Sequence, residues 1–370
     1  IDNATGGVLD TREVTFENTD PPTGEGTQTN PAETTPDGRE TREKVTLVTR
    51  PTVSGTQNWS VRIRPSGVRG PDAIAQDLIE TNNSADASIE LVDRPLRVLH
   101  LDGYPRWEYR YLKNVLVREG SIASASTILA PDRRYIQEGS EALDALPASP
   151  EEWARFDVLI IGDVLPTVFT PEQLAQIRDR VATAGLGVVW IAGEGAVPDA
   201  WRDTPLADLL PFSLGDPGDL GVAGPAVGAW GEPVVMVAAP AANQLGVLRL
   251  ADQQVNGSWW PERLSDPRTG WSQLRWAQRI APRSLNPTAD VLAVARPALG
   301  RGTGGAAIET PLVLSMRFGA GRSIYIGTDE IWRWRYGRGE FFTERFWLQI
   351  IRLLGRESVA RSGKPALLRV

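Results

Sequence analysis

The pattern of apolar and polar positions changes near Arg94, and the change predicts two segments of different class. Before this point, stretches such as residues 43–50 and 58–65 are rich in Val and Thr or alternate apolar with polar positions, as half-buried strands do. A polar stretch rich in Pro, Gly and Thr over residues 21–42 is typical of a loop. We therefore predict an all-β segment over residues 1–94 and interpret it as an immunoglobulin-like sandwich without its first strands.

After this point, continuous apolar runs alternate with stretches of helical periodicity. Runs of this kind are typical of strands buried on both faces, and they cover residues 96–101, 122–130, 156–164 and 187–195. In the helical stretch after the first run, Trp107, Tyr111, Val115 and Leu116 share a face that we expect to be buried. The alternation predicts right-handed βαβ units and an α/β domain over residues 95–370, with a doubly wound parallel sheet.

One helix in this domain carries clear signals at both ends. Thr170 is suited to the N-cap, Pro171 to the first helical position, and Gly185 or Gly187 to the end. Beyond the fourth strand the periodicity is lost, and we expect an irregular insertion at about residues 200–310.

The last third of the domain ends in a predicted hairpin and a helix. Residues 318–322 form the expected turn of the hairpin, whose second arm is expected to rejoin the main sheet. The helix predicted over residues 340–355 carries an apolar stripe made of Phe342, Phe346, Ile350 and Leu353.

Composition and charge narrow the possible functions. The 370 residues include 39 basic and 46 acidic side chains, a net charge of -7 that disfavours nucleic-acid binding. Cysteine is absent and His100 is the single histidine, which excludes ordinary zinc sites and thiol nucleophiles. No apolar stretch approaches the ~20 residues of a membrane span. Because the first residue is Ile1 rather than Met, we expect a fragment or processed product of a longer protein.

Acidic residues follow several predicted strands, which makes the carboxyl edge of the sheet the first candidate site. Ligands of open α/β sheets bind beyond the carboxyl ends of the strands. Two carboxylates can bind Mg²⁺ or Ca²⁺, and a crowded acid with a raised pKa can donate a proton. The acids placed at this edge are Asp102, Asp163, Glu194, Asp329 and Glu330.

Arginines reach the same edge and support a structural alternative, in which each acid is neutralised within the fold. In residues 329–347 arginines also alternate with Trp, which favours cation–π stacking. This stretch either contacts a nucleobase, a glycan or an aromatic group of a partner, or locks the last strand to the last helix. The arginines in question are Arg106, Arg110, Arg333 and Arg335.

Three stretches, residues 96–116, 156–194 and 327–354, resemble a family of large bacterial membrane-anchored proteins that is frequent in planctomycetes. Those proteins carry a membrane-anchor region of the BatA aerotolerance type and a von Willebrand A-like domain. An immunoglobulin-like segment and a class I glutamine amidotransferase-like domain follow. The resemblance covers about residues 60–360, only this later part, and implies a flavodoxin-like fold for the α/β domain.

The catalytic residues of true amidotransferases do not carry over. Those enzymes need a Cys at a strand-to-helix elbow and a later His and Glu, whereas Glu194 stands at the elbow-like position here and no His follows His100. The resemblance implies a non-catalytic scaffold or interaction module without a cofactor, whose partners are proteins or other domains of the same polypeptide. It implies a place in the cell envelope, with membrane attachment only through segments outside this chain.

Two alternatives to the scaffold remain open at this point. One is a hydrolase, or a divalent-cation or ligand-binding domain, that uses the carboxylates at the strand ends. The other is carbohydrate binding through a Trp-rich surface, since the chain contains 13 Trp. The position of the carboxylates relative to the arginines decides between the first alternative and the scaffold.

Overall fold

The computed structural model describes residues 1, 6–8, 10–11, 55–63, 84–91, 94–129, 135–215, 226–255, 257–298 and 309–362. The chain divides into two compact units, with the boundary between Asp93 and Arg94. The strand expected over residues 43–50 and the loop expected over residues 21–42 lie outside the described residues.

The described part of the first unit contains a pair of antiparallel strands, β1 (Gly55–Arg62) and β2 (Ser84–Leu91). β1 confirms the strand predicted from the alternating pattern over residues 58–65. Ser60 of β1 is buried, and its hydroxyl donates a hydrogen bond to Asp86 Oδ1 of β2 at 2.6 Å. Their place in an immunoglobulin-like sandwich stays a prediction.

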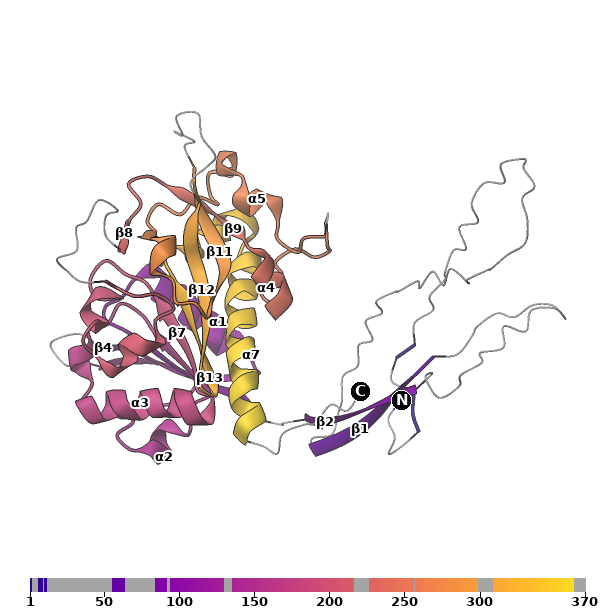
Figure 1. Cartoon of the computed structure of the whole chain (residues 1–370). Helices are drawn as coiled ribbons and strands as arrows, with labels where there is room; N and C mark the ends of the chain where they lie inside the picture. The colour runs from indigo at the N-terminus through magenta and orange to yellow at the C-terminus, as the bar shows by residue number, and fades with distance from the viewer. Residues whose placement is uncertain are drawn as a thin grey trace, which may run out of the picture. The chain divides into compact units, whose positions relative to one another are not determined.

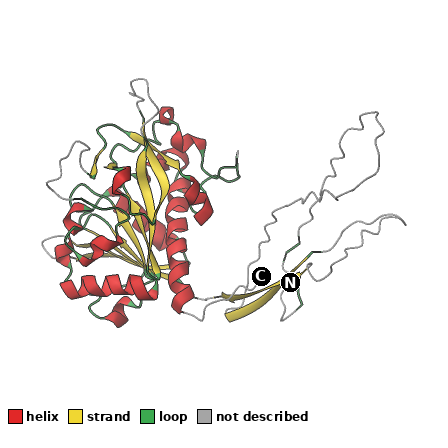
Figure 2. Ribbon diagram, in the orientation of Figure 1, coloured by secondary structure: helices red, strands yellow, loops and turns green. Residues whose placement is uncertain are grey.

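The second unit is built on one 9-stranded mixed sheet (Figures 1 and 2). Its adjacent parallel strands are β4 (Ile122–Leu129), β3 (Leu96–Asp102), β6 (Val158–Ile161), β7 (Gly187–Ile191) and β13 (Gly321–Ile326). Antiparallel strands extend both edges, namely β5 (Tyr135–Gly139) beside β4, and β12 (Thr310–Phe318), β11 (Ala289–Pro297) and β9 (Val234–Ala238) beyond β13. The α/β class is confirmed, whereas the prediction of a parallel sheet holds only for its centre.

Helices cover both faces of this sheet because its central strands are apolar on both faces. In β3 the neighbouring residues Val98 and Leu99 are both fully buried, but they join different hydrophobic clusters. Val98 lies in the cluster that contains side chains of α1 (Trp107–Arg118) and α7 (Phe341–Ser362), and Leu99 lies with side chains of α3 (Pro171–Ala184). The alternation of side chains along a strand produces these two cores.

α3 begins and ends where the sequence predicted. The Thr170 side chain accepts a hydrogen bond from the Gln173 N–H at 3.2 Å, and the Gln173 side chain accepts one from the Thr170 N–H at 2.9 Å. Pro171 occupies the first turn, and Gly185 follows the helix with φ 82°, a left-handed conformation that favours glycine. The short helix α2 (Pro150–Trp153) lies beside α3.

α1 buries half of the face that was predicted, namely Val115 and Leu116. Trp107 is 52% exposed and Tyr111 is partly exposed, although both were expected to be buried. The two rings pack on the side chain of Trp332 instead of the sheet, with centroids 5.8 and 6.0 Å from its ring. The face that α1 turns to the sheet consists of Glu108, Tyr109, Leu112, Val115 and Leu116.

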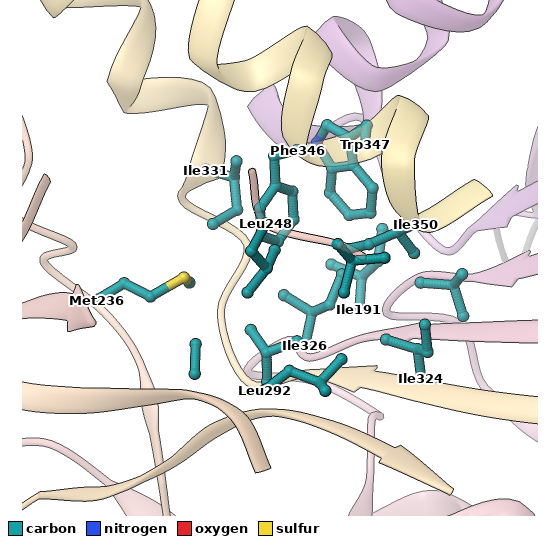
Figure 3. Close-up of a cluster of buried hydrophobic side chains, with 14 of the residues drawn as sticks. Ile191, Met236, Leu248, Leu292, Ile324, Ile326, Ile331, Phe346, Trp347 and Ile350 are labelled. Carbon is teal, nitrogen blue, oxygen red and sulfur yellow. The ribbon is translucent and has the colours of Figure 1, made fainter. Parts of the chain in front are cut away.

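α7 covers the centre of the sheet with one apolar side (Figure 3). The predicted stripe is confirmed at Phe342, Phe346 and Ile350, but Leu354 rather than Leu353 is fully buried. Burial of each such side chain stabilises the fold by about 1.5–3 kcal/mol. The same cluster includes Ile191, Ile324 and Ile326 of the central strands and Met236 and Leu292 of β9 and β11.

Two strands of the insertion, β9 and β11, belong to the main sheet, which the sequence did not predict. β8 (Val227–Ala229) pairs with β10 (Gln278–Ile280), and two short helices, α4 (Pro240–Leu245) and α5 (Glu262–Ser265), lie between them in the chain. The predicted hairpin is confirmed as β12 and β13 with Gly319 at its turn, and β13 rejoins the sheet beside β7.

Candidate functional site

Asp102 and Arg106 form a buried ion pair at the carboxyl end of β3. Arg106 Nε donates to Asp102 Oδ2 at 2.9 Å, and the Gly103 N–H donates to Asp102 Oδ1 at 2.9 Å. Arg106 Nη1 donates to the Ala192 carbonyl oxygen at 2.8 Å and to Asp329 Oδ2 at 3.2 Å. One arginine therefore joins the ends of β3, β7 and β13. This confirms, for Arg106, the prediction that arginines pair with the acids at the strand ends.

Burial and pairing act in opposite directions on the pKa values in this group. Burial raises the pKa of Asp102 and of Asp329 above their ordinary values, and the nearby Arg106 charge opposes that rise in both. Burial also disfavours the charged form of Arg106, but the two acids outweigh it and raise the pKa of the guanidinium. Direct N–H···O bonds join Arg106 to Asp102 and to Asp329, so the three groups form a charged network.

Asp163, which follows β6, is held by hydrogen bonds, and no arginine among the described residues pairs with it. The backbone N–H groups of Gly195, Ala196 and Val197 donate to it at 2.8, 2.6 and 2.8 Å. The Tyr104 hydroxyl donates to Asp163 Oδ2 at 3.0 Å. A carboxylate has about four acceptor positions. Four donors therefore leave Asp163 little capacity for a metal ion or a substrate, and its expected arginine partner is replaced by backbone.

Glycines allow the strand ends to close on these side chains. A Cβ atom on Gly103 would overlap the Asp163 carbonyl oxygen, and one on Gly193 would overlap the Asp163 carboxyl group. A Cβ atom on Gly162 would lie 2.6 Å from the carboxyl carbon of Asp102. The space between the ends of β3, β6 and β7 is thus filled by the protein itself. Open α/β sheets commonly bind their ligands at such a place.

Glu330 and Arg333 form a second charged group after β13. Glu330 Oε2 accepts hydrogen bonds from the Trp276 N–H at 3.0 Å and from the Arg275 N–H. Glu330 Oε1 lies 2.8 Å from Arg333 Nη2. The Arg333 guanidinium also lies over the Trp332 ring, 4.6 Å from its centroid. Glu330 is therefore engaged within the fold.

The other predicted site residues lie apart from this network. Glu194 is exposed, and no partner of its side chain is found in the described ranges. Arg110 is exposed and lies over the Trp107 ring, 5.6 Å from its centroid, so its expected pairing with an acid is wrong within those ranges. Arg335 pairs with Glu340 at 3.1 Å rather than with a strand-end acid. The charged network therefore joins the ends of β3, β7 and β13 and does not include the Glu194 side chain.

Glu108 of α1 is a buried acid that sequence reasoning missed. Its side chain accepts hydrogen bonds from the Trp332 N–H at 3.0 Å and from Trp347 Nε1 at 2.9 Å. Burial raises the pKa of Glu108 to about 8. Its spacing to Leu112 and Leu116, at i+4 and i+8, was the available signal that this acid faces the core.

His100 is a core residue of β3. It is fully buried, and neither ring nitrogen has a hydrogen-bond partner among the described residues. Burial lowers the pKa of His100 to about 3, so the ring is neutral at physiological pH. The ring centroid lies 4.9 Å from that of Tyr109. The histidine therefore packs under α1, as expected for a lone histidine in an apolar strand.

Aromatic side chains form a continuous surface beside the charged network. The ring of Trp332 lies 5.8 Å from that of Trp107 and 6.0 Å from those of Tyr111 and Tyr336. Trp107 is 52% exposed and Tyr336 is 71% exposed. Contiguous exposed apolar surface of this kind marks binding surfaces in soluble proteins. We call these four residues the aromatic ladder.

A small cavity opens at the Tyr336 end of the aromatic ladder. Its volume is about 210 Å³, and its lining consists of Gly270, Trp271, Gln273, Arg275, Arg333 and Tyr336. A second hollow, of about 460 Å³, includes Arg202, Phe212, Asn286 and Phe318 in its lining and none of the strand-end acids. Of these two hollows, the small cavity is the one that touches a residue of the candidate site, Arg333.

The described part of the chain contains neither a cluster of metal ligands nor a membrane-spanning helix. Within it, no group of three or more His, Cys, Asp or Glu side chains is placed to hold a metal ion. Within the same residues, no helix combines the length and the apolar character that crossing a membrane requires.

Comparison with known proteins gives no family. Neither a family model nor a curated protein matches the chain. The exo-beta-1,4-mannosidase Op5Man5 from Opitutaceae bacterium strain TAV5 is similar in structure, at 15% identity and TM-score 0.34, over 70% of this chain and 36% of that chain. The beta-galactosidase from Bacillus circulans sp. alkalophilus is similar at 14% identity and TM-score 0.35, over 74% and 32%.

The mmIFT52 N-terminal domain is similar at 11% identity and TM-score 0.33, over 73% of this chain and 100% of that chain. The chain spans 36% and 32% of the two glycosidases it resembles, about a third of each. At these scores the three likenesses assign neither a fold family nor a function to the chain.

Proposed function

We propose that this chain is a non-catalytic interaction module of a larger, membrane-anchored bacterial envelope protein. The observation that carries the proposal is the filled space at the ends of β3, β6 and β7. Arg106 is bound there to Asp102 and Asp329, and Asp163 accepts four hydrogen bonds. An enzyme of this class needs open space and an unengaged acid or base at that point.

We also propose that the α/β unit has a flavodoxin-like order and derives from a class I glutamine amidotransferase-like domain. In chain order the parallel strands are β3, β4, β6, β7 and β13, and their spatial order is second, first, third, fourth, fifth. This order is typical of flavodoxin-like sheets. The antiparallel pair β1 and β2 supports an immunoglobulin-like segment before it, which is part of the same proposal.

A second candidate function, carbohydrate binding, is favoured by one observation. Trp107 and Tyr336 of the aromatic ladder expose 52% and 71% of their surface, and flat exposed rings offer apolar platforms to a ligand. The ladder suits a protein partner equally, because Trp, Tyr and Arg dominate the energetic centres of protein interfaces. We place the interaction module first for this reason.

The proposal is tested by a search for hydrolysis. The purified chain is incubated with chromogenic esters, amides and glycosides, with and without Mg²⁺ or Ca²⁺, and calorimetric titration with the same ions runs in parallel. We expect no turnover above a heat-denatured sample and no heat of ion binding. Turnover or ion binding that Asp329→Asn or Glu194→Gln removes would establish the carboxylate alternative instead.

Glu194 is exposed, so its substitution leaves the fold intact and keeps the test decisive. Glu262→Gln is the matched control, because it removes another exposed carboxylate in the insertion. If Glu194→Gln and Glu262→Gln reduced an activity equally, that activity would not come from the carboxyl edge of the sheet. It would still contradict a non-catalytic role.

A further inference from the structure

The small cavity beside the aromatic ladder has the size of a single side chain. Its volume of about 210 Å³ lies below the roughly 300–1,000 Å³ of sites that enclose drug-sized ligands. It lies between a loop of the insertion, which supplies Trp271 and Arg275, and the segment after β13, which supplies Arg333 and Tyr336. A ligand that fits must present one compact group to it.

The Trp271 wall of the cavity is held in place from two sides. The Trp271 ring is stacked on Phe342 of α7, with centroids 6.0 Å apart and planes at 12°. Gly337 of the short helix α6 (Arg335–Arg338) packs closely against the Trp271 indole. A Cβ atom at this position would lie only 2.5 Å from Trp271 Cε2. The cavity is therefore formed in advance of any ligand, which lowers the entropic cost of binding.

The charged side chains in the lining of the cavity are two arginines. Arg275 is exposed, and its guanidinium forms no ion pair with an acid in the described ranges. Arg333 holds Glu330 through Nη2, while its Nε has no hydrogen-bond partner among the same residues. Guanidinium groups donate hydrogen bonds, accept none and match a carboxylate in shape. A carboxylate, unlike an uncharged sugar, forms charge-assisted hydrogen bonds with such groups.

We propose that this cavity receives the carboxylate of an Asp or Glu side chain from an acidic segment of a partner protein, while flanking apolar groups of that segment lie on the aromatic ladder. The assignment rests on the proposed interaction function and names the chemistry of the partner. Charge complementarity supports it, because Arg275 and Arg110 carry positive charge on either side of the ladder without an acid partner in the described ranges.

The test measures binding of an alternating Glu-Ala peptide to the full chain by fluorescence polarisation, with the matching Gln-Ala peptide as the neutral probe. We expect the acidic peptide to bind more tightly, and Arg275→Gln to weaken its binding about tenfold through loss of a charge-assisted hydrogen bond. Gly337→Ala, which displaces the Trp271 indole without changing charge, is expected to weaken binding as well. Thermal unfolding of each variant shows that it is folded.

Arg155→Gln is the matched control, because it removes an exposed arginine before β6, at the amino edge of the sheet, and changes the net charge equally. Equal weakening by Arg155→Gln, or equal binding of the two peptides, would overturn the proposal. Binding of polygalacturonate that depends on Arg275 in place of peptide binding would also overturn it, in favour of an acidic glycan. These outcomes would contradict the carboxylate-binding cavity but not the proposed non-catalytic module. Hydrolysis of a substrate would contradict the non-catalytic module, independently of the peptide-binding results.

Discussion

Arg106 shows what a short spacing in the sequence can and cannot predict. The Asp102–Arg106 pair lies within one strand-to-helix turn, so its proximity follows from local geometry. The bond from Arg106 to Asp329 spans 223 positions and depends on where β13 lies in the sheet. Arg110, one helical turn further, was expected to behave alike, but its side chain is exposed and lies over the Trp107 ring.

Arg106→Met is expected to destabilise the α/β unit by about 3–5 kcal/mol, because it leaves the buried Asp102 without its counter-ion. The measurement is the free energy of unfolding in urea. Arg110→Met is the matched control and is expected to change stability by less than about 0.5 kcal/mol. The double variant Arg106→Met, Asp102→Asn is expected to recover part of the loss. Equal losses for Arg106→Met and Arg110→Met would contradict the buried network.

The raised pKa of the buried Glu108 makes the free energy of unfolding depend on pH. Its pKa is about 8 in the folded protein and 4.5 without the fold, so the unfolded chain binds fewer protons between these values. Stability therefore falls as pH rises from 4.5 toward 8, by about 3 kcal/mol at neutral pH. We expect Glu108→Gln to flatten this part of the melting-temperature profile.

Glu194→Gln is the control for this profile, since Glu194 is an exposed acid outside the core. It is expected to leave the pH dependence of the melting temperature unchanged. A slope that persists in Glu108→Gln would show that other groups cause it.

At the scale of elements, burial decided which face of each helix meets the sheet. α3 was predicted fully because Thr170, Pro171 and Gly185 act within their own segment. The face of α1 was predicted correctly in its second half. The first half was wrong because Trp107 and Tyr111 find an apolar partner in Trp332, which follows a distant strand. Apolar periodicity alone does not say which neighbour covers an apolar side chain.

α7 continues beyond Gly355, the last residue of the predicted helix, to Ser362. Gly355 lies where a Cβ atom would be 2.7 Å from Leu96 Cδ1, so the glycine permits close packing of α7 on β3. Gly355→Ala is expected to destabilise the unit by about 1–3 kcal/mol, although alanine gains about 1 kcal/mol in helix propensity. The measurement is again unfolding in urea.

Gly120→Ala is the control, because nothing lies within 4 Å of a Cβ atom at that position. Combining Gly355→Ala with Leu96→Ala is expected to relieve the clash, so that the combined loss is smaller than the sum of the two. A stabilising effect of Gly355→Ala would show that helix propensity outweighs the contact.

For the whole molecule, the division between Asp93 and Arg94 agrees with the change of pattern in the sequence. Arg94 belongs to the second unit by its contacts, since its guanidinium lies 2.6 and 2.8 Å from the oxygens of Asp157. Asp157 also accepts hydrogen bonds from the Arg97 N–H at 3.0 Å and the Ser358 hydroxyl at 3.2 Å. The first arginine after the boundary thus helps to close the amino ends of β3 and β6 against α7.

A fragment of residues 94–365 is expected to unfold cooperatively on its own, because both hydrophobic clusters lie within it. A fragment of residues 96–365 is expected to be less stable by about 1–2 kcal/mol, since Arg94 is partly exposed and its loss leaves Asp157 with neutral donors only. Calorimetric melting of both fragments measures the difference. Arg94→Met in the longer fragment should reproduce it, and equal melting temperatures would contradict the role of Arg94.

The sequence by itself determined the α/β class, the central strands, the caps of α3 and the hairpin that returns to the sheet. These features depend on burial period and turn chemistry among residues that are close along the chain. Only the tertiary structure decided that Asp163 and Asp329 are engaged, that Glu194 is exposed, and that β5, β9 and β11 extend the sheet. Pairing of charges and of edge strands depends on distances between residues far apart in the chain, which a local pattern does not contain.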